Sequence, residues 1–517
     1  MKHGCNSSGA CGIGKTRRLL VALASLLGLV SGGGAQGIDS SAVLFDDGVV
    51  RQYRIDFYQE NWKETLASMW VADSGYLPAR FTDGTLVLDS VGVRYKGNSS
   101  YLLAGNNPKK PLKIKFNEFR DLTYHGIKVL NFSNGIGDPT LMREHIGYAI
   151  ARKYLSAPRS NFAHISVGDV ALGLYTQVEQ ADKTFLKRWY PNAKGTLFKA
   201  GDDGANLGWI DGNASSYAAS GAYELKTNET SEDWSGFLGF VDFLNNASDE
   251  AFCADRSKLL DDDNVAKFLA FNTVLSHFDS YNGSGRNWYM YQPDTATSFM
   301  SMIPWDLNLS FGAYGGASGA LNIGIDTTQA PIATRPLFRR FVACATTRDT
   351  YHRWLREMSI TSASADSVAA AVVRDSALIA AYVAADSNKF YTTAAWKTNL
   401  RANYRGSEGL ILGLVSFSQA RNASIASQLG QIIAVQPAGE ARRWKMVRSG
   451  ESWQVTGLES LGAGTLNWAS VDGRNHGSFE FKDGASGTLL TLPSGLVAIS
   501  VRSGRGSQSV ILHNSRK

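Results

Sequence analysis

The sequence predicts an α+β protein that folds as two units, a core of mixed helices and strands followed by a small C-terminal all-β sandwich domain. Between residues 36 and 436, segments with an apolar residue at every second position are interspersed with segments of helical periodicity. From about Pro437 the chain changes to short β-like runs separated by Gly, Ser and Asn turns, a pattern typical of a small β-sandwich. The length of 517 residues also exceeds the usual size of a single domain.

The first 35 residues are typical of a signal peptide. Residues 15–18 are mostly basic, residues 19–30 form an apolar run too short to span a bilayer comfortably, and residues 31–35 supply small side chains for cleavage after Ala35. No later stretch reads as long and apolar enough for a transmembrane helix. We therefore expect an exported protein, either secreted or held at the cell surface.

The net charge gives no reason to expect a polyanionic partner. The whole chain carries +6, but residues 1–35 contain four basic residues and no acidic one, so the remaining chain carries about +2. Nucleic-acid-binding domains and proteins that bind anionic membranes usually present a strong positive charge. The sequence therefore predicts neither kind of partner.

The cysteines that follow the predicted signal peptide leave two alternatives. Cys253 and Cys344 remain after cleavage, while Cys5 and Cys11 lie in the segment that is removed. An even pair in an exported chain suits a single disulfide, and two unpaired buried thiols are an equally good interpretation.

Two early segments carry cations on predicted strands. A strand ending at residues 93–100 delivers Arg94 and Lys96 into a Gly-Asn-Ser-Ser turn, which could present charges and backbone amides to phosphates or could be an ordinary β-turn. Residues 110–117 alternate so that Lys113 and Lys115 share one face, with apolar side chains on the other. That lysine face is either solvated or used to bind an anion.

The next segments predict a helix and a hairpin. Residues 140–155 have helical periodicity, and they include Arg143. Residues 161–167 and 173–178 read as two strands, and Glu179 follows the second one. Its carboxylate could pair with a strand lysine, or it could compensate the charge at a helix N-terminus.

Residues 277–312 hold most of the polar side chains expected to do chemistry. A helix over 265–275, capped at its start by residues 262–264, leads into a glycine-broken loop with Asp279, and two strands over 287–291 and 299–303 follow. Asp306 comes directly after the second strand. Oxygen-bearing side chains gathered at one sheet edge suit phosphoryl transfer with a divalent metal, and turn capping is the alternative.

Five segments occur in one order and together resemble the CotH kinase family. They lie between about Tyr53 and about Phe341, and are residues 94–100 (RYKGNSS), 110–116 (KPLKIKF), 178–183 (VEQADK), 223–228 (YELKTN) and 279–312, which contains Ile303-Pro304-Trp305-Asp306. The resemblance implies an atypical protein-kinase-like core. It further implies transfer of the γ-phosphoryl group of ATP, with Mg²⁺ or Mn²⁺, to Ser or Thr of secreted or surface proteins.

The same resemblance implies a role for each matching residue. Asp279 would be the catalytic aspartate, while Asn287 and Asp306 would hold the metal. Asn308 stands where many relatives have Asp, so it would be a neutral third ligand. The nucleotide-binding residues would be Lys113 or Lys115, Glu179 as the partner of that lysine, and secondarily Arg94 and Arg143.

The rest of the chain divides in two. Residues 343–431 predict a helical extension, with helices over 362–385 and 404–429. Residues 437–517 contain seven β-like runs and form the predicted accessory or sorting domain, through which the protein could attach to a cell surface. Two functions stay open, an active exported kinase and a catalytically silent surface-binding module on the same fold.

Overall fold

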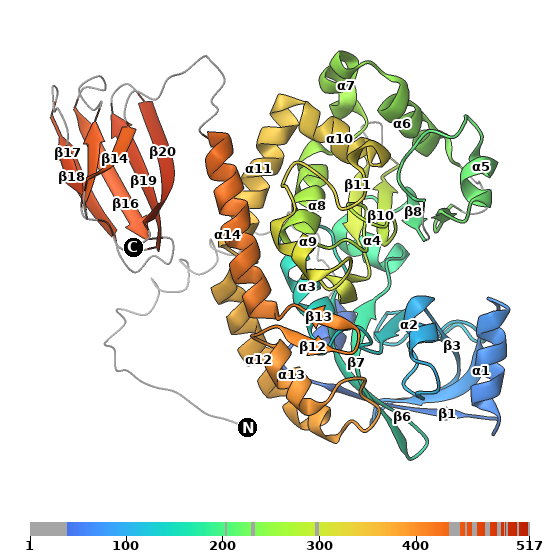
Figure 1. Cartoon of the computed structure of the whole chain (residues 1–517). Helices are drawn as coiled ribbons and strands as arrows, with labels where there is room; N and C mark the ends of the chain where they lie inside the picture. The colour runs from blue at the N-terminus through green and yellow to red at the C-terminus, as the bar shows by residue number, and fades with distance from the viewer. Residues whose placement is uncertain are drawn as a thin grey trace, which may run out of the picture.

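The structure is a computed structural model, and it describes residues 39–201, 204–228, 233–294 and 299–433. In the C-terminal region it describes residues 445–449, 452–456, 463–470, 476–482, 488–490, 492, 495–503 and 506–514. Helices and strands are mixed along the chain, which confirms the α+β class (Figure 1). The predicted signal peptide lies outside the described residues.

The first unit is a closed barrel with strand order β1-β2-β3-β4-β5-β7-β6. All neighbours pair antiparallel except β1 and β6, which close the barrel in parallel. The strands are β1 (Arg51–Phe57), β2 (Leu77–Thr82), β3 (Val87–Tyr95), β4 (Leu112–Lys115), β5 (Val129–Ser133), β6 (Ser160–Val167) and β7 (Val170–Glu179). The helical segments of this part are η1 (Ser40–Phe45), α1 (Trp62–Val71), α2 (Ser99–Leu103) and α3 (Arg143–Ala151).

Apolar side chains of alternate strand residues fill the barrel. In β4, Leu112 and Ile114 are buried in this core, while Lys113 and Lys115 lie on the opposite face and stay partly exposed. The period of two that predicted this strand is therefore confirmed, including which face the lysines occupy. The predicted hairpin is also present, as β6 and β7.

A second sheet has the order β11-β10-β8-β9, and a separate apolar core surrounds it. Its strands are β8 (Thr196–Ala200), β9 (Tyr223–Leu225), β10 (Trp288–Gln292) and β11 (Ser301–Pro304). The helical segments near it in sequence are α4 (Lys183–Trp189), α5 (Ala214–Ala219), α6 (Ser235–Asn246), α7 (Asp249–Asp255), η2 (Arg256–Lys258), α8 (Asp262–Val274), η3 (Leu307–Leu309), α9 (Ala317–Asn322) and η4 (Ile332–Thr334).

Helix α8 leads into the polar segment and begins at Asp262, three residues before the predicted start at Val265. The carboxylate of Asp261 accepts a hydrogen bond from the backbone N–H of Asn264 at 3.0 Å, so Asp261 is the cap, and Asp262 and Asp263 fill the first turn. Acidic residues in a first turn interact favourably with the helix dipole. The helix is buried along most of its length, which fixes the point from which the following loop starts.

The helical extension is present, but part of it was wrongly predicted. Its helices are α10 (Pro336–Ala343), α11 (Ala345–Ile360), α12 (Ala365–Ala385), α13 (Thr393–Asn399) and α14 (Leu414–Ile433). The predicted helix over 404–429 instead starts with a hairpin of β12 (Tyr404–Gly406) and β13 (Gly409–Ile411). Glycines explain the difference, because Gly409 has a φ of 108° and a Cβ at Gly413 would collide with the backbone of Ala402.

Helix α12 corrects a second expectation. Among the described helices it is the one long and apolar enough to cross a membrane by length and composition, although no such stretch was expected after the N-terminal segment. Its alanines and valines supply the apolarity. In the structure α12 packs against α14 and β7 through one face, on which Val368, Val372 and Ile379 are buried.

The two later cysteines form a disulfide. Cys253 lies in α7 and Cys344 lies between α10 and α11, with their Cα atoms 5.7 Å apart. Of the two alternatives, a disulfide or two unpaired thiols, the structure has the disulfide. It joins the helices beside the second sheet to the helical extension across 91 residues of sequence.

Each of the seven predicted C-terminal runs contains a strand. The strands are β14 (Lys445–Ser449), β15 (Ser452–Thr456), β16 (Gly464–Ser470), β17 (His476–Phe481), β18 (Thr488–Leu490), β19 (Gly495–Ser503) and β20 (Gly506–Asn514). They form two sheets, with the orders β14-β15-β18 and β17-β16-β19-β20. Packing of these sheets as a sandwich stays a prediction.

Candidate functional site

A short loop after α8 holds Asp279 in a fixed position. We call residues 276–287 the Asp279 loop. The Asp279 carboxylate is mostly buried and accepts hydrogen bonds from Nε of Arg286 and Nδ2 of Asn287, each at 3.0 Å. The same Nδ2 also donates to the Asp279 carbonyl at 2.9 Å. Asn287 thus fixes both the backbone and the side chain of Asp279.

Asn287 and Asp306 lie at neighbouring strand ends. Strands β10 and β11 pair so that Trp288 faces Pro304, and the N–H of Trp305 donates to the carbonyl of Asn287 at 3.3 Å. Both polar residues are in the left-handed region, with φ of 62° for Asn287 and 54° for Asp306. Asn and Asp tolerate this conformation better than most residues, and such strain often clusters at functional sites.

A third carboxylate, which the sequence analysis did not select, faces Asp306. Glu144 comes from the first turn of α3 and is 4% exposed. Burial, together with the negative charge of Asp306, raises the pKa of Glu144, and burial likewise raises the pKa of Asp306. Oε2 of Glu144 has no hydrogen-bond partner. Asp279, Asp306 and Glu144 form what we call the carboxylate cluster.

Replacing Glu144 with Gln should stabilise the metal-free protein, by on the order of 1 kcal/mol, because it removes a carboxyl group whose ionised form is disfavoured by burial and by the charge of Asp306. The gain should be absent at acidic pH, where Glu144 is protonated in both the folded and the unfolded protein, and should grow as the pH rises from its ordinary pKa toward its raised pKa in the folded protein. Thermal unfolding of both proteins from pH 5 to pH 8 measures it. Glu118→Gln, which removes only a partly exposed partner of Lys115, is the control. A lower melting temperature for Glu144→Gln at pH 8 would contradict this description.

Four lysines, which we call the cation cluster, lie opposite these carboxylates. Lys96 follows β3, Lys113 is on β4, Lys199 is on β8 and Lys226 follows β9. Burial, and then the charges of Lys226, Lys199, Lys96 and Arg94, lower the pKa of Lys113 to about 7. Neighbouring positive charges that lower the pKa of Lys113 favour the binding of an anion there, because an anion offsets their repulsion.

The charges of the cation cluster act on the carboxylate cluster. The charge of Lys96 acts against the burial that raises the pKa of Glu144 and of Asp306, and Lys199 also acts on Asp306. Near the lysines, Glu224 forms ion pairs with Lys199 at 3.6 Å and with Lys226. Lys96 and Lys113 come from the barrel while Lys199 and Lys226 come from the second sheet, so the site needs both units.

The structure distinguishes the two lysines of β4. Lys113 belongs to the cation cluster, whereas Nζ of Lys115 pairs with Glu118 at 2.6 Å and lies over the ring of Tyr76. Arg94 is opposite Lys113 in the strand register, but its guanidinium donates to Asp73 at 2.8 Å. Lys113 is therefore the strand lysine available to a ligand.

The predicted pair between Glu179 and a strand lysine is wrong. Glu179 is buried and instead pairs with Arg159 at 2.8 Å and with Arg188. The strand register gives the reason, because Glu179 is opposite Leu130, which is opposite Ile114. Directly paired residues point to the same face of a sheet, so Glu179 points away from the face that carries Lys113.

Two other predicted residues lie outside the site. Arg143 is fully buried, donates to Asn399 Oδ1 at 2.7 Å and to the carbonyl of Leu412 at 2.6 Å, and pairs with Asp138 at 3.1 Å. It therefore joins α3 to the helical extension. Asn308 lies in η3 and is partly exposed, and within the described part of the chain its side chain makes no hydrogen bond to the carboxylate cluster.

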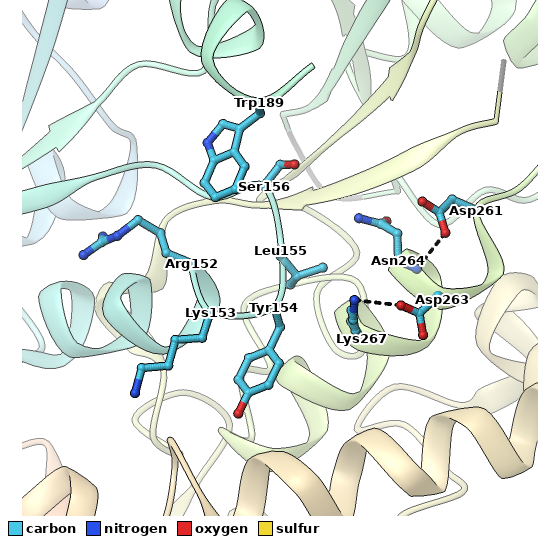
Figure 2. A pocket seen from close by; sticks show the side chains of 10 residues that line it. All are labelled: Arg152, Lys153, Tyr154, Leu155, Ser156, Trp189, Asp261, Asp263, Asn264 and Lys267. Carbon is cyan, nitrogen blue, oxygen red and sulfur yellow. Dashed lines mark hydrogen bonds and ion pairs between the residues drawn. The ribbon is translucent and has the colours of Figure 1, made fainter. Parts of the chain in front are cut away.

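A cavity of about 290 Å³ lies elsewhere, beside the end of α3 and the start of α8 (Figure 2). Two interactions between its lining residues are drawn as dashed lines in Figure 2. They are the ion pair of Lys267 with Asp263 at 2.7 Å and the hydrogen bond from Asn264 to Asp261 that caps α8. None of its lining residues belongs to the carboxylate cluster or the cation cluster. The cavity is therefore separate from the candidate site.

Comparison with known proteins identifies one family. The family described as CotH kinase protein matches residues 93–424. This range covers the cation cluster, the carboxylate cluster and nearly all of the helical extension, and it continues well beyond the residues that carried the resemblance in the sequence. No curated protein is a significant match to the chain. Since the match spans most of its residues, the chain belongs to the CotH kinase family.

Proposed function

We propose that this protein is an exported atypical Ser/Thr protein kinase that transfers the γ-phosphoryl group of ATP to secreted or surface proteins. The observation that carries the proposal is that lysines from both units repel one another around Lys113 while two of them also act on the buried carboxylates of Asp306 and Glu144. Phosphoryl transfer needs both: cations for the phosphates, and carboxylates for the metal and for the acceptor hydroxyl. In this proposal the barrel is the smaller lobe of a kinase-like core, and the second sheet belongs to the larger lobe.

The cation cluster is the proposed phosphate site. Lys113 is surrounded by the positive charges of its three neighbours, and Glu224 forms ion pairs with two of these, Lys199 and Lys226. A triphosphate would relieve the repulsion between the lysines and favour their charged forms. Lys113 is the residue most sensitive to this change, since its pKa is lowered to about 7.

The carboxylate cluster fits a divalent cation that prefers oxygen ligands. Within the described ranges no group of three or more His, Cys, Asp or Glu residues has the geometry of a metal site. Mg²⁺ does not require one, since it is usually bound through one or two protein carboxylates plus substrate phosphates. Asp306 and Oδ1 of Asn287 would hold the ion, with the partnerless Oε2 of Glu144 beside them. The ion would neutralise charge on the phosphates.

Asp279 is the proposed catalytic residue. Its Oδ2 is held by Asn287 and its Oδ1 by Arg286, so the carboxylate is presented in one orientation. It would accept the proton of the acceptor hydroxyl as the oxygen attacks the γ-phosphorus. Arg286 is in place to position the carboxylate and to limit the negative charge around it.

The disulfide supports the proposed export. Disulfides persist in oxidising compartments and are rare where thiols are kept reduced. Residues 1–35 would act as the signal peptide. Residues 437–517 would form a β-sandwich that attaches or sorts the protein, and no candidate site residue lies in that range.

A transfer assay tests the proposed function. The full chain without its first 35 residues is incubated with γ-labelled ATP, Mg²⁺ or Mn²⁺, and a serine-rich protein such as casein. We expect label on the acceptor or on the protein itself, and none with EDTA. The protein could instead bind ATP with metal but transfer no phosphate to casein, to itself or to proteins from the cell surface. That result would favour the silent binding module.

ATP binding should be coupled to proton uptake by Lys113. In the free protein at pH 8, Lys113 is mostly neutral, since its pKa is about 7. Bound phosphates raise this pKa, so formation of the complex is accompanied by the uptake of about one proton at most. The affinity for ATP therefore falls as the pH rises above 7. Calorimetry in two buffers with different ionisation enthalpies measures the uptake.

Two variants assign that proton. Lys113→Met should lose most of the uptake, while Lys115→Met, on the same strand and face, should keep it. If both variants take up protons as the wild type does, Lys113 does not contact the phosphates.

A further inference from the structure

The backbone of the Asp279 loop is held by an unusually complete set of hydrogen bonds. Within the loop, Ser284 N–H donates to the Phe278 carbonyl at 2.7 Å, and the N–H groups of Gly283 and Gly285 donate to the Ser280 carbonyl at 3.0 and 2.9 Å. A Cβ at Gly283 would collide with the Phe278 carbonyl, so this tight fold depends on glycine. The loop is compact, and some of its carbonyls point outward.

Those outward carbonyls are bound from outside the loop. The N–H of Gln329 donates to the Asn282 carbonyl at 3.0 Å. Arg335 binds two others, through Nε to the Tyr281 carbonyl at 2.6 Å and through Nη2 to the Gly283 carbonyl. Its Nη1 donates to the carbonyl of Thr334 at 2.8 Å. One guanidinium therefore fixes the loop to the segment just before α10.

Arg335 has no acidic partner to explain its burial. It is 6% exposed, and no carboxylate of the described chain lies within ion-pair distance of it. A buried cation is costly unless its donors are satisfied, and here backbone carbonyls satisfy them. A planar guanidinium can bind two carbonyls in a fixed geometry, whereas the ammonium of lysine acts as a point charge.

The loop also contains strain that needs such support. Ser276 and Asn287, at its two ends, have φ of 42° and 62°. Left-handed conformations of residues other than glycine cost on the order of 1 kcal/mol or more and persist only where surrounding contacts enforce them. Asn287 is the residue that fixes Asp279, so a loosened loop would misplace the Asp279 carboxylate.

We propose that Arg335 is a positioning residue, which holds the Asp279 loop in the geometry that phosphate transfer requires. It acts through backbone carbonyls and not through substrate. The proposal rests on the proposed kinase function for its effect on rate, but the effect on the loop itself is independent of that function.

Arg340, which lies in α10 five residues after Arg335, offers a matched control. It is 5% exposed, and it donates to backbone carbonyls of Leu244, at 3.0 Å, and Ala247, and to Asp249 at 3.1 Å. Like Arg335 it is a buried arginine that binds carbonyls. Its partners lie at the end of α6, away from the Asp279 loop.

The experiment compares R335K with R340K, and uses R335Q if R335K does not fold. Hydrogen exchange of peptides covering residues 278–288 should speed up about tenfold in R335K and remain unchanged in R340K. The kcat for phosphate transfer should fall about 10- to 100-fold in R335K, with KM for ATP within about twofold of wild type. R340K should have the kcat of wild type when it is assayed at a temperature well below its melting temperature.

The two readouts separate the two ideas. If R335K and R340K give the same exchange in the loop and the same kcat, Arg335 has only a general structural role and the inference fails. If the wild type transfers no phosphate, the proposed function fails, and the exchange data still decide whether Arg335 holds the loop.

Discussion

Asp279→Asn should reduce phosphate transfer by about 10²- to 10⁴-fold while ATP binding stays within about twofold of wild type. Asparagine has nearly the same shape and can still accept from Nδ2 of Asn287, so the loop should keep its structure. It cannot accept the proton of the acceptor hydroxyl. The lost ion pair with Arg286 is mostly buried, so the variant should be less stable than wild type and is assayed well below its melting temperature.

Single-turnover transfer of labelled phosphate, with calorimetry for ATP, measures this effect. Asp262→Asn is the matched control, since Asp262 is a partly buried carboxylate at the other end of α8 and is ion-paired with Arg256 at 3.0 Å. It should transfer phosphate at the wild-type rate. A fully active Asp279→Asn protein would mean that another residue accepts the proton.

Asp306→Asn should remove the dependence of nucleotide binding on metal. We expect the affinity for ATP with Mg²⁺ to fall at least ~100-fold, about 2.7 kcal/mol, while the weaker metal-free binding is unchanged. Asparagine suits the left-handed backbone at this position, where alanine would add strain. It also removes the charge that raises the pKa of Glu144, so the variant should be at least as stable as wild type.

Titrations with ATP, with and without Mg²⁺, test this prediction. Asn308→Ala is the informative comparison, because the resemblance made Asn308 a metal ligand and, among the described residues, its side chain makes no hydrogen bond to the carboxylate cluster. It should bind within about twofold of wild type. If Asp306→Asn binds ATP with Mg²⁺ as tightly as wild type, Asp306 is not the metal ligand.

The sequence predicted most of the local structure because local patterns determine it. Alternation in 110–117 identified β4 and the face that carries Lys113. The motif order placed Asp279, Asn287 and Asp306 together because one hairpin and its flanking loops carry all three. The error over 404–429 arose where glycines override helical periodicity.

What the sequence did not reveal depends on contacts between distant elements. Glu144 and Lys199 join the site only because α3 and β8, which are distant in sequence, both approach Asp306. One signal was present, since Lys199 interrupts a strand whose neighbours Phe198 and Ala200 are buried. The prediction for Glu179 was wrong because its side chain points to the opposite face of the barrel from Lys113. That direction follows from the pairing of Glu179 with Leu130, which the sequence alone does not show.

The most direct test of the shared nucleotide and metal site is a crystal structure with Mn²⁺ and a non-hydrolysable ATP analogue. Anomalous scattering from Mn²⁺ locates the ion independently of the protein ligands. We expect one peak at ~2.1 Å from a carboxylate oxygen of Asp306, the usual distance for small hard cations. The analogue's phosphates should lie against Lys113 and Lys199. An ion bound away from Asp306, or phosphates that do not touch the cation cluster, would contradict the account.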